Sequence, residues 1–76
     1  MQNNTALKIN FNKKFYKLPS IKNAIRDFQN VCKGSVKELE RYFLVTLAPK
    51  SKSPQDNLGH EFSNYVLALM KNEVLV

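Results

Sequence analysis

Few residues in this 76-residue chain have the types and spacing that catalysis or metal binding requires. The chain has one cysteine, Cys32, and one histidine, His60, which are too few ligands for a tetrahedral zinc site. Glu61 has no acidic residue three or four positions away, so it lacks a partner for acid–base catalysis. Gly34 and Gly59 are the only glycines, and neither belongs to a phosphate-binding loop motif. We therefore expect a protein that is not an enzyme, with no catalytic residue, no cofactor and no metal site.

The positive charge of the chain lies in its first half. The formal net charge is +6, from 12 basic and 6 acidic residues. Residues 1–38 contain eight of the basic residues and two of the acidic ones, whereas residues 39–76 are balanced. This bias favours an anionic partner, either nucleic acid or an acidic polypeptide, although a lysine-rich surface can also serve solubility alone.

The sequence contains no recognisable targeting or membrane segment. Its N-terminus lacks a basic stretch followed by an apolar one, and its longest apolar runs are about six residues, where a membrane span needs about 20. A lone cysteine cannot form an intramolecular disulfide, so nothing indicates an oxidising compartment. We expect a cytoplasmic protein that does not bind membranes.

The first element predicted is a strand over residues 7–12. Leu7, Ile9 and Phe11 alternate with polar residues, and this period of two is typical of a strand with one buried face. Residues 1–5 are polar, and we expect them to be frayed.

A helix is predicted next, starting after Ser20. Ser20 is a suitable N-cap, and Gly34 is a suitable residue just beyond the C-terminal end. Between them, apolar residues recur in a single stripe at about 100° per residue. These are Ile21, Ala24, Ile25, Phe28, Val31 and Cys32. We expect Cys32 to be a small buried hydrophobic residue on this stripe.

Residues 35–49 fit two different structures. As a hairpin, a strand over 36–39 turns at residues 40–41 into a strand over 42–48, with Pro49 at its end. Phe43, Val45 and Leu47 would then face one side. As a helix, residues 35–38 form a capping box and the following apolar spacing is nearly helical. The hairpin is favoured, although its turn lacks Gly, Asn or Asp.

A second helix is predicted after the polar connector of residues 49–57. Either Ser53 or Asp56 caps it. Its core stripe consists of Leu58, Phe62, Tyr65, Val66 and Leu69. Gly59 costs about 1 kcal/mol relative to alanine, and His60 lies off the stripe, at the surface.

The predicted fold class is α+β, with the order β-α-β-β-α in a single small domain over residues 1–76. The simplest arrangement is a three-stranded sheet in the order first, third, second, with both helices on one face. It resembles a ferredoxin-like fold that lacks its last strand. In such a sheet the first strand is an open edge.

The open edge is the first candidate partner-binding surface. Unpaired backbone groups there can accept a strand from a partner peptide or from a second copy of the chain, which would give a homodimer. The candidate residues are Lys8, Asn10, Lys13 and Lys14, whose charge favours an acidic segment.

The second candidate surface is the side of the last helix opposite its core stripe. Asn64 and Leu67 lie there, with Met70 flanking them. Outward apolar side chains beside polar ones are typical of a small contact patch, although scattered surface apolar residues look the same.

Nucleic-acid binding is the alternative function. Residues 13–17 interleave lysines with Phe15 and Tyr16, as single-strand-binding proteins do. The outer face of the first strand, however, carries Lys8, Asn10 and Asn12 and no aromatic platform for stacking bases.

Three stretches together resemble one family, the small D-type (HxsD-like) proteins of His-Xaa-Ser radical-SAM peptide maturation systems. They are "FYKLPSIKNAIRDFQNVC", "FLVTLAPK" and "LGHEFSNYVLALM", which include Tyr16, Ala24, Phe28, Glu61, Phe62 and Asn64. The resemblance implies a strand-containing fold. It also implies a non-catalytic accessory protein that binds a precursor peptide, a radical-SAM maturase or both, with the iron–sulfur chemistry in the maturase.

Overall fold

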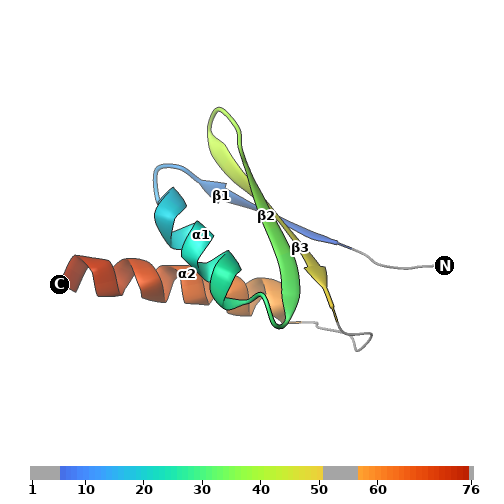
Figure 1. The fold of residues 1–76 in the computed structure, drawn as a ribbon. Coiled ribbons are helices and arrows are strands. Elements are labelled where there is room, and N and C mark those ends of the chain that lie inside the picture. The colour runs from blue at the N-terminus through green and yellow to red at the C-terminus, as the bar shows by residue number, and fades with distance from the viewer. Residues whose placement is uncertain (1–5, 51–56, 76) are drawn as a thin grey trace.

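A computed structural model of the protein describes residues 6–50 and 57–75, the side chains of residues 73–75 excepted. The elements along the chain are β1 (Leu7–Asn12), α1 (Leu18–Asp27), β2 (Cys32–Glu38), β3 (Tyr42–Pro49) and α2 (Leu58–Leu75) (Figure 1). The predicted order β-α-β-β-α is therefore confirmed, and so is the strand predicted over residues 7–12.

The three strands form one antiparallel sheet in the order β1-β3-β2. Phe11 lies opposite Phe43, and Val45 lies between Ile9 of β1 and Val36 of β2. Both β1 and β2 are therefore edge strands, as was predicted for β1.

Both helices lie on one face of this sheet, which leaves the other face uncovered (Figure 1). The core between the two layers consists of the inward side chains of the strands and the apolar stripes of the helices. Its buried apolar members are Phe11, Ile21, Ala24, Cys32, Phe43, Val45, Leu47, Leu58, Phe62 and Val66. An aromatic cluster joins the layers, because the Phe62 ring lies 6.1 Å from that of Phe11 and 5.2 Å from that of Phe28.

The helix α1 begins and ends earlier than predicted. Its N-cap is Lys17, which makes no side-chain cap, and Pro19 fixes the backbone of the first turn. Ser20, predicted as the N-cap, is instead fully buried inside the helix. The helix ends at Asp27, and the Phe28 N–H still donates to the Ala24 carbonyl.

Cys32 and Gly34 lie in β2 and not at the end of a helix, so that part of the prediction was wrong. Cys32 is nevertheless buried, and Gly34 lies opposite Leu47 of β3. β2 forms seven residue pairs with β3, and this pairing stabilises the strand more than one or two further apolar residues at helical spacing would stabilise a longer helix. Gly34 has no positive φ; a Cβ there would lie 3.1 Å from Ile25 Cγ2 and from Leu47 Cδ2. Its small size lets α1 approach the sheet.

The hairpin reading of residues 35–49 is confirmed and the helical one is excluded. The first strand of the hairpin differs from the predicted 36–39, because β2 begins at Cys32 and ends at Glu38. Residues 39–41 join it to β3, and the Leu39 N–H donates to the Tyr42 carbonyl (2.8 Å). Phe43, Val45 and Leu47 all face the core, as predicted. The predicted helix caps, Ser53 and Asp56, lie outside the described residues. Within the described ranges, no helix has the length and apolar character needed to cross a membrane.

Candidate partner-binding site

Part of the β1 backbone has no hydrogen-bonding partner among the described residues. The Lys13 N–H donates to the carbonyl of Arg41, the residue directly opposite it across the β1–β3 ladder (3.1 Å). Because hydrogen-bonded pairs alternate in an antiparallel ladder, Leu7, Ile9 and Phe11 also direct their backbone groups toward β3. The N–H and C=O groups of the even-numbered residues therefore point away from the sheet.

One end of this edge is closed by the turn that follows it. The Asn12 carbonyl accepts the N–H groups of Phe15 and Tyr16 (3.0 Å each), and its side-chain Oδ1 accepts the Lys14 N–H (2.8 Å). The open groups of β1 are therefore both backbone groups of Lys8 and Asn10, together with the N–H of Asn12.

The other edge, β2, carries stronger protection against pairing. Two backbone hydrogen bonds show which residues of β2 bond to β3. The Leu39 N–H donates to the Tyr42 carbonyl, and the Lys50 N–H donates to the Val31 carbonyl. They direct the backbone groups of the even-numbered residues outward. One of these residues is Glu38, whose charged side chain lies in the same row as Phe43, on the core-facing side. A charge pointing inward at an edge is one of the ways natural sheets prevent unwanted pairing.

The edge β1 has no such charge. Its core-facing side chains are Leu7, Ile9 and Phe11, of which Leu7 is 36% exposed. On the outer face, Lys8 is the only charged residue of the strand, beside the exposed Asn10. The strand predicted as the binding edge is thus also the less protected of the two.

Lys13, although predicted for the same surface, is bound within the protein. Its Nζ lies 2.8 Å from Glu38 Oε2 and 5.4 Å from the centre of the Phe43 ring. The side chain therefore crosses the end of β3 on its core-facing side instead of extending from the β1 edge. The hydrogen bond and charge of Lys13, with the charge of Lys22, lower the pKa of Glu38.

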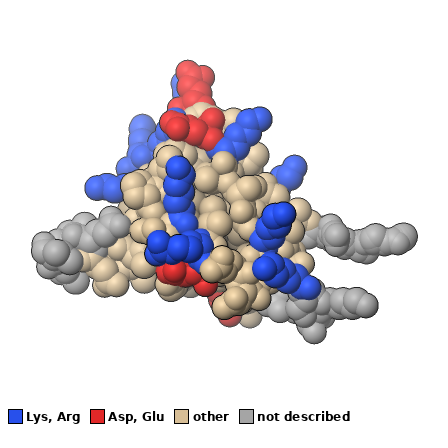
Figure 2. All heavy atoms as spheres, in the orientation of Figure 1, with Lys and Arg blue, Asp and Glu red and all other residues tan. Residues whose placement is uncertain are grey.

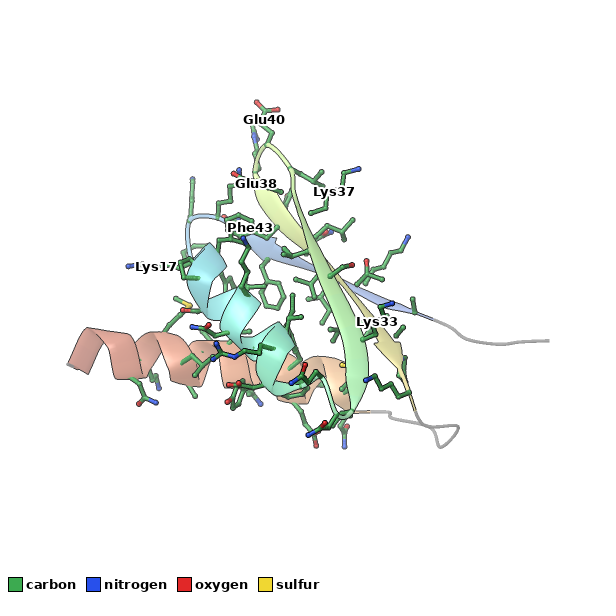
Figure 3. All side chains as sticks on the ribbon, in the orientation of Figure 1. Lys17, Lys33, Lys37, Glu38, Glu40 and Phe43 are labelled. Carbon is green, nitrogen blue, oxygen red and sulfur yellow. The ribbon has the colours of Figure 1, made fainter. Side chains whose placement is uncertain are left out.

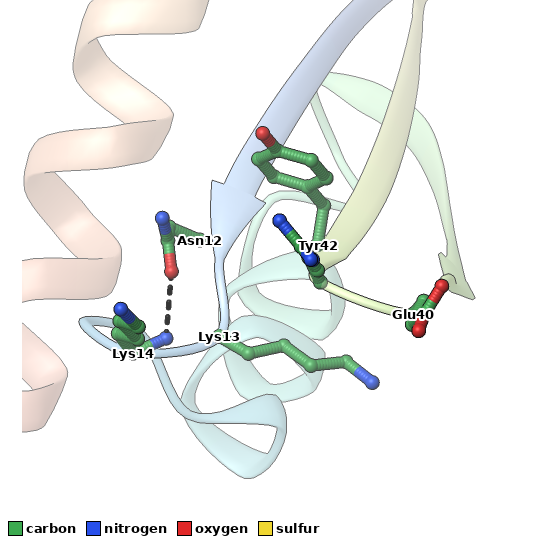
Figure 4. Close-up of a pocket in the computed structure, with 6 residues that line it drawn as sticks. Asn12, Lys13, Lys14, Glu40 and Tyr42 are labelled. Atoms are coloured by element: carbon green, nitrogen blue, oxygen red, sulfur yellow. Dashed lines mark hydrogen bonds between the residues drawn. The ribbon is translucent and has the colours of Figure 1, made fainter.

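Lys14 lies in a hollow that the sequence did not predict. This hollow, of about 540 Å³, lies where the end of β1 meets the start of β3, and Asn12, Lys13, Lys14, Glu40, Arg41 and Tyr42 line it (Figure 4). Asn12 and Tyr42 both line the hollow because they lie opposite each other in the β1–β3 register. Among the described side chains, none forms a salt bridge with Lys14 or Arg41.

The uncovered face of the sheet is basic. Lys8 on β1, and Lys33 and Lys37 on β2, flank the central strand, and Figure 3 shows Lys33 and Lys37 on the side of β2 away from the helices. Tyr42, 42% exposed, lies on this face of β3. Figure 3 shows Glu38 and Glu40 near the tip of the β2–β3 hairpin instead, and in Figure 2 acidic side chains gather at that end of the molecule. The outer face of the first strand, which alone was considered for stacking bases, has no aromatic residue, so Tyr42 was not among the predicted site residues.

The second predicted surface, on α2, belongs to the other layer of the molecule. Asn64 is exposed and Leu67 is 39% exposed, but Met70 is partly buried against the core. The structure therefore does not bring these residues together with Lys8 and Asn10. The edge and the helix face are separate candidates.

The described side chains include no group of three or more His, Cys, Asp and Glu residues that could hold a metal ion. His60 is exposed. Cys32 is buried, and this burial raises the pKa of its thiol, so the reactive thiolate is disfavoured.

Comparison with protein-family models, with curated proteins and with solved structures finds no match to this chain.

Proposed function

We propose that this protein is a non-catalytic binding module that accepts a strand of a partner polypeptide along the edge of β1. The observation that carries the proposal is the pair of open residues, Lys8 and Asn10, on an edge without an inward charge. Unpaired N–H and C=O groups in this geometry supply main-chain affinity for an extended peptide.

The surroundings of the edge define the peptide that fits. Side chains of an added strand would alternate between the two faces of the sheet. Those on the outer face would lie beside Lys8, which favours an acidic residue. Those on the inner face would lie beside Leu7 and Ile9, which favours an apolar one. The preferred segment therefore alternates acidic and apolar residues.

The resemblance to the D-type proteins of peptide maturation systems supports a more specific version of this proposal. The partner would be a ribosomally made precursor peptide or the radical-SAM maturase that modifies it, in the cytoplasm. In this version the protein presents or positions one of the two, and the maturase performs the chemistry.

Replacing Asn10 with proline tests the edge directly. The Asn10 N–H points away from β3. Asn10→Pro therefore removes a hydrogen-bond donor offered to the partner, while the hydrogen bonds between β1 and β3 are kept. We expect at least about tenfold weaker binding, since a lost hydrogen bond is worth about 1 kcal/mol and the ring adds a steric obstacle. Calorimetric titration with a synthetic peptide of alternating acidic and apolar residues measures it.

Leu67→Asp and Lys50→Ala are the matched controls, and circular dichroism must show that each variant folds. Both should bind like the wild type. Loss of binding in Leu67→Asp alone would assign the partner to the α2 face and refute the edge mechanism.

Single-stranded nucleic acid is a second candidate, favoured by the exposed Tyr42 among the lysines of the outer face. Tight binding of a mixed-sequence oligonucleotide, falling steeply with salt and lost in Tyr42→Ala, would support it.

A further inference from the structure

We infer that β1 pairs with β1 of a second copy of this chain, around a two-fold axis beside Ile9, to make a continuous six-stranded sheet. This inference rests on the proposed function in one respect, namely that β1 is an edge able to accept a strand. It adds the identity of one occupant and the register in which that occupant binds.

The open backbone groups define the register. Within β1, Lys8 and Asn10 each offer both an N–H and a C=O, and these four groups bond to one another when Lys8 is set against Asn10 of the second copy. The symmetric pairing then adds the reciprocal bonds, with Ile9 facing Ile9 across the axis. The open N–H of Asn12 falls opposite Ala6.

The neighbouring registers are each worse. Shifting the axis to Lys8 sets two lysines directly against each other, and like charges in a cross-strand pair are destabilising. Shifting it to Asn10 sets Lys8 against Asn12, whose carbonyl already accepts two N–H groups. A register that pairs an even-numbered residue with an odd-numbered one fails for another reason. It sets open backbone groups of one copy against backbone groups of the other that are already bonded to β3.

The side chains agree with this register on both faces. On the outer face each Lys8 lies beside an asparagine, so no charge is opposed by its like. On the inner face Ile9 meets Ile9, and Leu7, now 36% exposed, lies opposite Phe11 of the second copy, which is already buried in its own chain, so the surface to be covered is that of Leu7 and Ile9. The pairing therefore buries apolar surface that the single chain leaves open.

The assembly is closed, which explains why it stops at two copies. A two-fold axis uses the same edge of both copies and leaves none of it free, so a partner strand binds only in place of the second copy. The ends of the six-stranded sheet are then the two β2 strands, each protected by the inward Glu38. The four helices all lie on one face.

Disulfide trapping tests the register. Facing residues that are not hydrogen-bonded have Cα atoms about 4.5 Å apart, within the range for a disulfide. In a Cys32→Ala background, Ile9→Cys should therefore form a covalent dimer under mild oxidation, seen on a non-reducing gel. Lys8→Cys and Asn10→Cys should each form no covalent dimer alone and should form a mixed covalent dimer when combined.

Those two surface variants keep the test decisive even if Ile9→Cys, being partly buried, does not fold. Sedimentation of the wild type at about 100 µM should give a dimer, and Asn10→Pro a monomer. A monomeric wild type without trapping would overturn the inference, and so would self-trapping of Asn10→Cys. If partner binding is nevertheless lost in Asn10→Pro, the proposed function stands alone. If dimers trap as described while partner binding survives that substitution, the dimer stands and the proposed function fails.

Discussion

The Tyr65 hydroxyl links the two helices by a single polar contact. It donates to Asp27 Oδ2 at 2.5 Å, while Asp27 also contacts the Arg26 Nε at 3.4 Å. The hydrogen bond from Tyr65, with the contribution of Arg26, lowers the pKa of Asp27, and the same bond raises the pKa of Tyr65. Since α1 ends at Asp27, this contact fixes the last residue of the helix against α2.

Tyr65→Phe should therefore change how stability depends on pH. The lowered pKa of Asp27 means that its contribution is present above its unfolded pKa, about 4, and is lost as the pH falls through its lower folded value. The raised pKa of Tyr65 means that its contribution to stability is present below its unfolded pKa, about 10, and is lost as the pH rises through its higher folded value. We expect Tyr65→Phe to melt a few degrees lower at pH 7 and to lose less further stability at both extremes. Thermal melts from pH 2 to 11 measure this.

Tyr42→Phe is the control for that experiment, because no described group hydrogen-bonds to the Tyr42 hydroxyl. It should melt like the wild type at every pH. An equal change in both variants would show that the Tyr65–Asp27 bond is not its cause.

At the scale of elements, the two glycines serve opposite roles. Gly34 in β2 leaves no room, since an added Cβ would meet Ile25 of α1 and Leu47 of β3, both at 3.1 Å. At Gly59 in α2 the nearest obstacle is the tip of Leu7, at 3.1 Å, and that side chain is partly exposed and can move.

Alanine at these two positions should shift stability in opposite directions. Gly34→Ala overpacks the contact between α1 and the sheet and should cost about 1–3 kcal/mol. Gly59→Ala removes backbone freedom from the unfolded chain at a position without positive φ and should gain about 0.4–1 kcal/mol. Urea unfolding of both variants measures the difference, and destabilisation of similar size in both would contradict it.

Sequence periodicity predicted the elements with clear alternation or clear helical spacing and failed where two patterns overlap. The strand over residues 7–12 and the core stripe of α2 are where they were expected. The boundary near Cys32 was missed because an apolar residue at helical spacing can equally belong to a strand, and only pairing with β3 decides. Likewise Lys13 could not be assigned from sequence, because its partner Glu38 is 25 residues away.

The molecule as a whole has a small core. Phe62 is fully buried and lies between the rings of Phe11 and Phe28. A domain of this length has a total stability of about 4–11 kcal/mol, at about 0.05–0.15 kcal/mol per residue. One such side chain is therefore a large fraction of the whole.

Phe62→Ala should remove about 3–5 kcal/mol, a large part of the total stability of the protein. Phe15→Ala is the matched control, because Phe15 is 66% exposed, and it should stay within about 0.5 kcal/mol of the wild type. Denaturant midpoints followed by circular dichroism decide. A folded Phe62→Ala protein with a near wild-type midpoint would show that the aromatic cluster is dispensable.

The strand order also determines when each part of the sheet can form. β2 and β3 are joined by only three residues, whereas the pairs between β1 and β3 join residues at least thirty positions apart. Closing the longer loop costs more chain entropy, so the hairpin is the natural starting structure and β1 attaches afterwards. Pulse-labelled hydrogen exchange measures this order, as protection of the β2 and β3 amides before those of β1. The strand that we propose binds other polypeptides is thus the one expected to attach last, and until it does so the hairpin exposes a further edge, that of β3.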